Sequence, residues 1–328
     1  MARPHAVTAV APGTVANVTC GFDVLAFAIR RPADTVHAAR DERPGVRLVA
    51  VEGDGGVLPT AAERNTAGVA ALHLFRLRDL PIDRGEGVAL TLTKGLPLNS
   101  GLGSSAASGV AAALAVDALL GTELDPDELL ACAVEAERVA TGCGHADNAA
   151  AAIQGGFVMV RATEPPRPYS IPLAAGLSYA IARPHLGVDT GDARRVLPND
   201  VPLGLAVKQS ANLAGLVIGL THGDEDLIRS SMVDVLAEPH RIGAVPPFHA
   251  IRDAALEAGA LGAGLAGSGA SVFALCGDPG TADDVSRAMR DAVTETKCDQ
   301  HAGLLGAPGA RIVQVEGPPG EDDDPCAT

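Results

Sequence analysis

A segment rich in glycine and serine, "GLPLNSGLGSSAASG", occupies residues 95–109 and leads into a run of small apolar residues. Glycines let backbone N–H groups approach an anion closely, and the first turn of a helix presents further N–H groups to it. The hydroxyl groups of Ser104 and Ser105 add two more donors at that point. The segment therefore predicts a loop that wraps the phosphates of a nucleotide.

Three other interpretations of this segment fit less well. A Walker A loop needs a Lys after its last Gly, and none follows Gly101 or Gly103. Gly101, Gly103 and Ala106 match the G-x-G-x-x-A of a dinucleotide-binding turn, but "KGLPLNS" separates them from the strand that the first Gly should end. A flexible connector rarely leads straight into a buried helix. We therefore favour the phosphate-wrapping loop.

A carboxylate on an apolar helix face is the second candidate group. In the predicted helix over 126–141, Glu137 shares a face with Leu130, Ala133 and Val134, which precede it at helical spacing. An unpaired carboxylate in such a place costs several kcal/mol, so it needs a cation. Mg²⁺ beside a triphosphate would supply one, and a structural pair with an Arg is the alternative.

The elements around these groups follow from periodicity and capping. Asp125, Pro126, Glu128 and Gly142 form the start and stop signals of the helix over 126–141. Alternating apolar residues predict strands, and helical spacing predicts helices. In the first half we expect strands at 5–11, 22–29, 46–51, 88–93 and 156–160, and helices at 64–77 and 104–120.

The second half has the pattern of a separate α+β unit. A proline-rich loop, "RATEPPRPYSIPLAA", marks the expected boundary, and the acidic end "EGPPGEDDDPCAT" is expected to be disordered. We therefore predict domains over 1–165 and 166–315, followed by a tail over 316–328. Within the second domain we expect strands at 177–183, 271–276 and 311–315, and helices at 204–221, 224–236, 247–258 and 281–296.

Composition narrows the classes of function. Among the 328 residues, 40 acidic against 25 basic side chains give a formal charge of −15, which argues against nucleic acid or an anionic membrane as partner. The six cysteines form no C-x-x-C pair, so neither a zinc site nor a disulfide framework is indicated. The segment "MARPHAVTAVAPG" has no long apolar stretch, so we expect a cytoplasmic protein.

Several motifs together resemble one enzyme family. "PLNSGLGSSAA", from Pro97 to Ala107, is similar to the phosphate-binding motif of the GHMP kinases, named for galactokinase, homoserine kinase, mevalonate kinase and phosphomevalonate kinase. The stretches at 11–29, 144–160, 189–198, 238–241 and 262–271 resemble further motifs of its homoserine-phosphorylating branch. Val15, Val18, Ala266 and Ala270 depart from those motifs, which leaves substrate identity more open than ATP binding.

The resemblance implies a fold and a reaction. The fold would be α+β, the two-domain GHMP kinase fold, with an N-terminal domain like domain 2 of ribosomal protein S5 and a C-terminal ferredoxin-like α/β sandwich. The reaction would transfer the γ-phosphate of ATP to L-homoserine with Mg²⁺ as cofactor, on the route to threonine. The alternatives are another GHMP kinase acting on L-threonine, mevalonate or a sugar, and a non-catalytic ligand-binding protein. The family also raises the expectation of a homodimer.

The resemblance assigns the nucleotide site residue by residue. Ser105 and Glu137 would bind Mg²⁺, and Ser104 would contact the phosphates. Asn65 and Thr66 would contact adenine. The full set expected to bind ATP is Asn65, Thr66, Pro97, Leu98, Asn99, Ser100, Gly101, Leu102, Gly103, Ser104, Ser105, Ala106 and Ala107.

A homoserine site needs partners for an ammonium, a carboxylate and a hydroxyl group. Asp23 suits the ammonium, and Arg194 with Arg241 can clamp the carboxylate. The substrate-binding set is Asn17, Asp23, His145, Asn148, Thr190, Arg194 and Arg241, and the catalytic set is Asn148, Asn17, Glu137 and Arg194.

The predicted mechanism is direct attack of the substrate hydroxyl on the γ-phosphate. Phosphoryl transfer depends mostly on positioning and charge neutralisation, so a strong base is not obligatory. Asn148 stands where related kinases often have an Asp, and an amide cannot accept the alcohol proton. We therefore expect Asn148 and Asn17 to orient the hydroxyl, with Asp147 as the alternative base.

Overall fold

The computed structural model describes residues 3–317, apart from residues 86, 143, 162–163 and 189. Its larger sheet has seven strands, in the order β11-β1-β2-β4-β3, and β5 pairs with β2 and β6 with β5. All of these pairs are antiparallel except β3 with β4. The strands are β1 (Ala6–Ala16), β2 (Leu25–Asp41), β3 (Val46–Glu52), β4 (Gly87–Thr93), β5 (Phe157–Arg161), β6 (Arg167–Ser170) and β11 (Arg311–Glu316).

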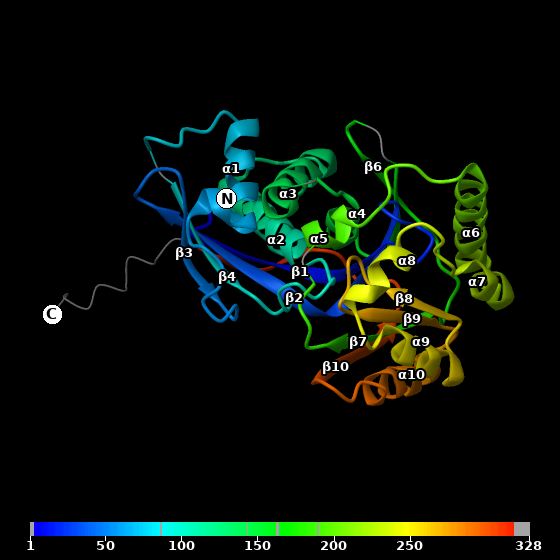
Figure 1. The fold of residues 1–328 in the computed structure, drawn as a ribbon. Coiled ribbons are helices and arrows are strands. Elements are labelled where there is room, and N and C mark those ends of the chain that lie inside the picture. The colour runs from blue at the N-terminus through cyan, green and yellow to red at the C-terminus, as the bar shows by residue number, and fades with distance from the viewer. Residues whose placement is uncertain (1–2, 86, 143, 162–163, 189, 318–328) are drawn as a thin grey trace.

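Four helices pack together against this sheet (Figure 1). They are α1 (Thr66–Leu77), α2 (Ser104–Leu120), α3 (Pro126–Thr141) and α4 (Asp147–Gln154), and a 3₁₀ turn (Ala62–Arg64) precedes α1. α2 contacts β1 and β2 on one side and α1 and α3 on others, which is why nearly all of its residues are small or apolar. Both of its ends are left-handed glycines, Gly103 and Gly121. The glycine-rich loop is thereby fixed to the most buried helix of the domain.

A second, four-stranded antiparallel sheet has the order β10-β7-β9-β8. Phe27 on β2 lies within 6.0 Å of the rings of Tyr179 and Phe273, so the cores of the two sheets meet there. The strands are β7 (Ser178–Pro184), β8 (Gly262–Leu265), β9 (Val272–Cys276) and β10 (Cys298–Leu304), and α9 (Phe248–Glu257) and α10 (Pro279–Asp291) pack on this sheet. The remaining helices are α5 (Thr190–Arg195), α6 (Leu203–His222), α7 (Glu225–Ser231) and α8 (Glu238–Arg241), with a 3₁₀ turn at Ile242–Ala244.

The strongest helix signals of the sequence match the structure. α2 and α3 have the predicted bounds, and the capping box of Asp125 and Glu128 is formed. The predicted strand over 22–29 begins later, at Leu25, because a turn with several positive φ angles precedes it. The predicted helices over 224–236 and 281–296 are too long, since α7 ends at Ser231 and α10 at Asp291. The elements missed in the sequence are α4, α5, α8, β6, β8 and β10, all short or without clear apolar alternation.

The strand pairing differs from the predicted division of the chain at residue 165. Strands β6 and β11 fall in the predicted second domain, but both pair in the seven-stranded sheet, β6 with β5 and β11 with β1. The chain thus returns to the first sheet after it completes the second. The predicted disordered tail begins at Glu316, which ends β11, and residues 318–328 lie outside the described part.

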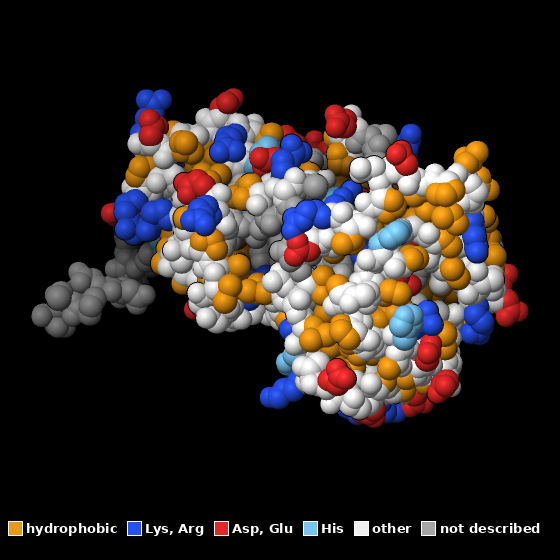
Figure 2. All heavy atoms as spheres, viewed as in Figure 1, with side chains coloured by type: hydrophobic (Ala, Val, Ile, Leu, Met, Phe, Trp, Pro, Cys, Tyr) orange, Lys and Arg blue, Asp and Glu red, His pale blue; other side chains and the backbone are white. Residues whose placement is uncertain are grey.

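α6 is the most exposed long helix of the structure. Among the described residues, it is the helix whose length and hydropathy would allow it to cross a membrane, which by itself is weak evidence. Figure 2 shows apolar side chains over this part of the surface, where Leu203, Val207 and Ile218 are exposed. Lys208 and three glycines interrupt its apolar sequence.

Candidate active site

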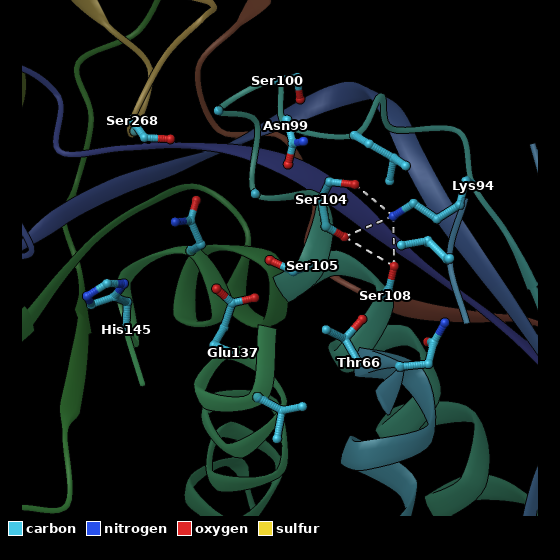
Figure 3. A pocket seen from close by; sticks show the side chains of 18 of the residues that line it. Thr66, Lys94, Asn99, Ser100, Ser104, Ser105, Ser108, Glu137, His145 and Ser268 are labelled. Carbon is cyan, nitrogen blue, oxygen red and sulfur yellow. Dashed lines mark hydrogen bonds between the residues drawn. The ribbon is translucent and has the colours of Figure 1, made fainter. Parts of the chain in front are cut away.

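A cavity of about 570 Å³ lies between the domain of the seven-stranded sheet and the domain of the four-stranded sheet, with the glycine-rich loop as one wall. The other walls come from the starts of α1 and α4, from Glu137 on α3, and from Gly267 and Ser268 in the loop between β8 and β9 (Figure 3). Its volume is in the range of cavities that bind cofactor-sized ligands. Segments between residues 58 and 268, from both halves of the chain, therefore build one site.

The backbone of the glycine-rich loop leaves no room for a side chain at Gly101 and Gly103. Asn99, Gly101 and Gly103 have positive φ angles of 52°, 77° and 64°. A Cβ atom on Gly103 would overlap the Thr14 hydroxyl and lie 2.8 Å from Oδ1 of Asn148. A Cβ atom on Gly101 would overlap backbone carbonyl oxygens of the β8–β9 loop. Glycine is thus required at both positions by conformation and by space.

Lys94 connects the end of β4 to the first turn of α2. Its ammonium is almost fully buried and forms an ion pair with Asp34, which is also buried. The same Nζ donates hydrogen bonds to the hydroxyl groups of Ser104 at 2.7 Å and Ser108 at 2.8 Å (Figure 3). Asp34 in turn accepts from the backbone N–H groups of Gly95 and Leu96. This cluster fixes the base of the loop.

Glu137 points from α3 toward the start of α2, beside Ser105 (Figure 3). Loss of solvent raises the pKa of its carboxyl to about 7, although a hydrogen bond with the Ser105 hydroxyl opposes the shift. The predicted face is correct, because Leu130 and Ala133 are buried with it. A desolvated carboxylate and a hydroxyl thus lie together on the cavity wall, and a cation there would stabilise the carboxylate in its ionised form.

Asp147 and Asn148 open α4 but face different surroundings. Asn148 lines the cavity, and its Oδ1 accepts a hydrogen bond from the Thr14 hydroxyl at 2.7 Å. Asp147 is buried, accepts from the backbone N–H of Asn148 at 2.7 Å and is not part of the cavity wall. Desolvation raises the pKa of the Asp147 carboxyl to about 7, and the negative charge of Asp23 adds to this effect.

Of the residues predicted to recognise an amino acid, His145 and Asn148 line this cavity, whereas Arg194 and Asp23 do not and are connected to it through His145. Arg194 on α5 donates to Oδ2 of Asp23 and to Nε2 of His145, both at 2.7 Å. A guanidinium group only donates, so Nε2 of His145 accepts this bond and the imidazole is neutral. Desolvation lowers the pKa of His145, which also favours the neutral form. The groups predicted to bind the ammonium and the carboxylate of a substrate thus pair with each other here.

Arg241 at the end of α8 completes this end of the site. It donates from Nε to the carbonyl of Ala193 at 3.0 Å and from Nη1 to that of Gly267 at 3.3 Å. It lines a smaller cavity of about 10 Å³ together with Asn17, and Gly267 borders both cavities. Asn17 donates to the same Gly267 carbonyl and accepts from the backbone N–H of Asp23.

Most of the residues predicted to bind ATP line the larger cavity. Leu102, Ala106 and Ala107 do not, because they are buried behind the loop, and Pro97 does not either. The side-chain amide of Asn65 caps α1, accepting from the N–H of Ala67 and donating to the Pro59 carbonyl. The residues on the cavity wall are Asn65, Thr66, Leu98, Asn99, Ser100, Gly101, Gly103, Ser104 and Ser105.

Thr190 begins α5, and its side chain lies outside the described residues. Residues of the site that had no assigned role in the sequence include Thr14, Asp34, Lys94, Ser108 and Ser268. A signal existed for Lys94, since it is one of three lysines in the chain and directly follows the strand before the loop. No local signal pairs it with Asp34, which lies 60 residues earlier.

Comparison with known proteins identifies the family. The model for the N-terminal domain of GHMP kinases matches residues 65–156, and that for their C-terminal domain matches residues 216–295. A homoserine kinase of Chlorobium phaeobacteroides is 42% identical over 313 residues, which cover 92% of this chain and 98% of that protein. The chain belongs to the GHMP kinase family. The resemblance predicted from the motifs is thereby confirmed.

Other members of this family extend the match. A homoserine kinase of Xylella fastidiosa is 40% identical over 311 residues, or 94% of each chain. The crystal structure of homoserine kinase from Cytophaga hutchinsonii superimposes with a TM-score of 0.89 at 40% identity, covering 94% of this chain and 98% of that one. Mevalonate kinase of L. major, at 17% identity and a TM-score of 0.72, shares the fold. The predicted two-domain α+β GHMP kinase fold is therefore confirmed.

Proposed function

We propose that this GHMP kinase phosphorylates L-homoserine with ATP, giving ADP and O-phospho-L-homoserine on the route to threonine. The main support is that His145, on the wall of the cavity formed by the glycine-rich loop, accepts a hydrogen bond from Arg194, which pairs with Asp23. A positive and a negative side chain at one end match a zwitterion, and the backbone amides at the other end suit phosphates. The relatives named homoserine kinase support the same substrate.

The donor set beside the loop fits Mg²⁺. Mg²⁺ usually takes one or two carboxylates and completes its shell with water and substrate phosphates. Glu137 and Ser105 provide such a partial set, and the described residues hold no cluster of three or more His, Cys, Asp or Glu side chains that could cage a metal alone. Glu137 and Ser105 would hold the ion. When bound, Mg²⁺ neutralises charge on the transferring phosphoryl group.

The chain's own residues position both substrates for in-line transfer. The N–H groups at the start of α2 and the hydroxyl of Ser104 bind the phosphates, while the Lys94 ammonium keeps Ser104 in place. Arg194 and Arg241 bind the substrate carboxylate, and Asp23 its ammonium. The amide of Asn148, held by Thr14, orients the hydroxyl group toward the γ-phosphate with help from Asn17.

Asp147 is a poor candidate for the base, because its carboxylate faces the first turn of α4 and not the cavity. We expect Asp147→Asn to keep single-turnover phosphorylation within about tenfold of wild type, since only a positioned base would contribute more. Single-turnover assays with saturating substrates measure this. A loss of about 100-fold or more without weaker binding would reverse the assignment and make Asp147 the base.

The substrate is tested by ADP release against homoserine, threonine, serine, mevalonate and galactose. We expect homoserine to give the highest kcat/KM.

Asp23→Ala should raise the KM for homoserine strongly, because the ammonium loses its counter-charge. Turnover of mevalonate or galactose that survives this substitution would favour the alternative GHMP kinases. The absence of ADP release with all five compounds would favour a non-catalytic binding protein.

Two further properties complete the proposal. We expect a cytoplasmic enzyme whose partners are small molecules, since the charge of −15 disfavours nucleic acid and anionic membranes. We also expect a homodimer. Sedimentation at several concentrations tests the oligomeric state.

A further inference from the structure

The turn between β1 and β2 carries an aromatic ring whose partners are both charged. Phe22 is half-buried beside Asp23, and its ring has the guanidinium carbon of Arg194 at 5.4 Å and that of Arg241 at 5.0 Å from its centroid. The two arginines come from α5 and α8, far from Phe22 in the sequence. Nothing in the motif around Phe22 indicates this convergence.

The backbone of this turn is held in an uncommon conformation. Asn17, Val18, Thr19 and Asp23 all have positive φ angles, between 39° and 71°, although none is a glycine. Such conformations persist only where the surrounding structure fixes them, and they concentrate at functional sites. The side chain of Asn17 supports the turn through the N–H of Asp23. The turn thus presents Phe22 and Asp23 to the arginines in a defined orientation.

Two guanidinium groups that serve one carboxylate repel each other when the carboxylate is absent. Arg241 is buried and anchored by the carbonyls of Ala193 and Gly267, whereas Arg194 is partly exposed. Asp23 offsets part of the charge, but it must turn to the ammonium when substrate binds. An aromatic face is negative and stacks well on guanidinium groups, so it can hold both cations without occupying their N–H donors.

We propose that Phe22 is a specificity-determining positioning residue, whose ring holds Arg194 and Arg241 together as one receptor for the carboxylate of the amino-acid substrate. This inference rests on the proposed function. The ring acts on substrate through the two arginines and does not touch the reacting atoms. A substrate without a carboxylate would not benefit from the ring, so Phe22 favours alcohols that carry a carboxylate over those that do not.

Phe22→Leu tests this, with Phe22→Tyr as the conservative control that keeps the ring. The assays measure kcat and KM for L-homoserine, KM for ATP, and inhibition constants of L-2-aminobutyrate and its amide, which lack the hydroxyl group and differ in the carboxylate. We expect Phe22→Leu to raise the KM for homoserine and the inhibition constant of L-2-aminobutyrate about tenfold. The KM for ATP and the inhibition constant of the amide should stay within about twofold, and Phe22→Tyr should resemble wild type.

An unchanged KM for homoserine, or equal losses for the acid and the amide, would overturn the role of Phe22. The first result would mean that Phe22 does not affect substrate binding. The second would mean that Phe22 makes only apolar contact with the substrate, independent of the carboxylate. Phe22→Met is made in parallel in case Phe22→Leu does not fold, since its flexible side chain fills similar space. Failure of the proposed function has a different signature, because wild type itself would then not phosphorylate homoserine.

Discussion

Two ion pairs border the candidate site, and their surroundings differ. Lys94 and Asp34, beneath the glycine-rich loop, have side chains that are 2% and 0% exposed, whereas Arg194 and Asp23, at the amino-acid end, are 38% and 32% exposed. A buried pair cannot separate without leaving a charge unpaired, but an exposed pair can exchange its partner for a ligand. We therefore infer that the proposed phosphate end is preformed and that the proposed amino-acid end opens for its substrate.

Breaking the buried pair should have the largest effect. Lys94→Met leaves the Asp34 carboxylate buried beside Ser108 without its cation, so we expect the free energy of unfolding to fall by about 3–5 kcal/mol. Ser104 also loses a hydrogen bond, so the KM for ATP should rise. Urea denaturation and ATP titration measure the two effects. The control is Lys208→Met on the exposed face of α6, and equal stability losses in both variants would contradict a preformed phosphate end.

Replacing a loop glycine should reduce activity next most strongly. Gly103→Ala places a methyl group onto the Thr14 hydroxyl and against Asn148, so we expect kcat/KM for ATP to fall by about 100-fold or more. Gly121→Ala is the matched control, because Gly121 has a similar φ of 66° at the other end of α2 but open space around it. Both variants bear the cost of a left-handed alanine, roughly 1–2 kcal/mol. Comparable losses of kcat/KM in Gly103→Ala and Gly121→Ala would show that the left-handed backbone conformation of the alanine causes the loss, and not its contact with Thr14 and Asn148.

Breaking the exposed pair should change binding more than stability. For Arg194→Met we expect the KM for homoserine to rise about 10- to 100-fold, while the free energy of unfolding changes by less than about 1 kcal/mol. Steady-state kinetics and thermal unfolding measure both. Arg195→Met is the control on the same helix, since Arg195 pairs with Asp192 at the surface. A stability loss as large as that of Lys94→Met would remove the contrast between the two ends.

A different contrast, between contacts that are near in the sequence and contacts that are far apart in it, explains what the sequence could and could not predict. The phosphate loop, α2 and α3 were predictable because their glycines, serines and capping residues act within a few positions of one another. Glu137 was placed correctly for the same reason, by the spacing of one helix. Lys94 with Asp34, and Phe22 with Arg194 and Arg241, depend on chain segments that meet only in the fold, and no local pattern encodes such meetings. The residue types indicated the chemistry there, and the pairing came from the structure.

The smallest effect should come from Glu238, a half-buried acid that lines the smaller cavity together with Arg241. It accepts from the N–H of Leu265, and desolvation raises the pKa of its carboxyl from 4.5 to about 7. The folded state therefore binds a proton more tightly than the unfolded state, so this group's contribution to stability is complete below about pH 4.5 and is lost as the pH rises through about 7.

Glu238→Gln keeps the acceptor but cannot ionise, so the melting temperature of this variant should fall less than that of wild type between about pH 4.5 and pH 7. Glu257→Gln, at the exposed end of α9, should follow wild type. If the melting temperatures of wild type and Glu238→Gln changed with pH in parallel, the carboxyl group of Glu238 would have to be solvated in solution. The opening of the amino-acid end would then include Glu238 as well as the pair of Arg194 and Asp23.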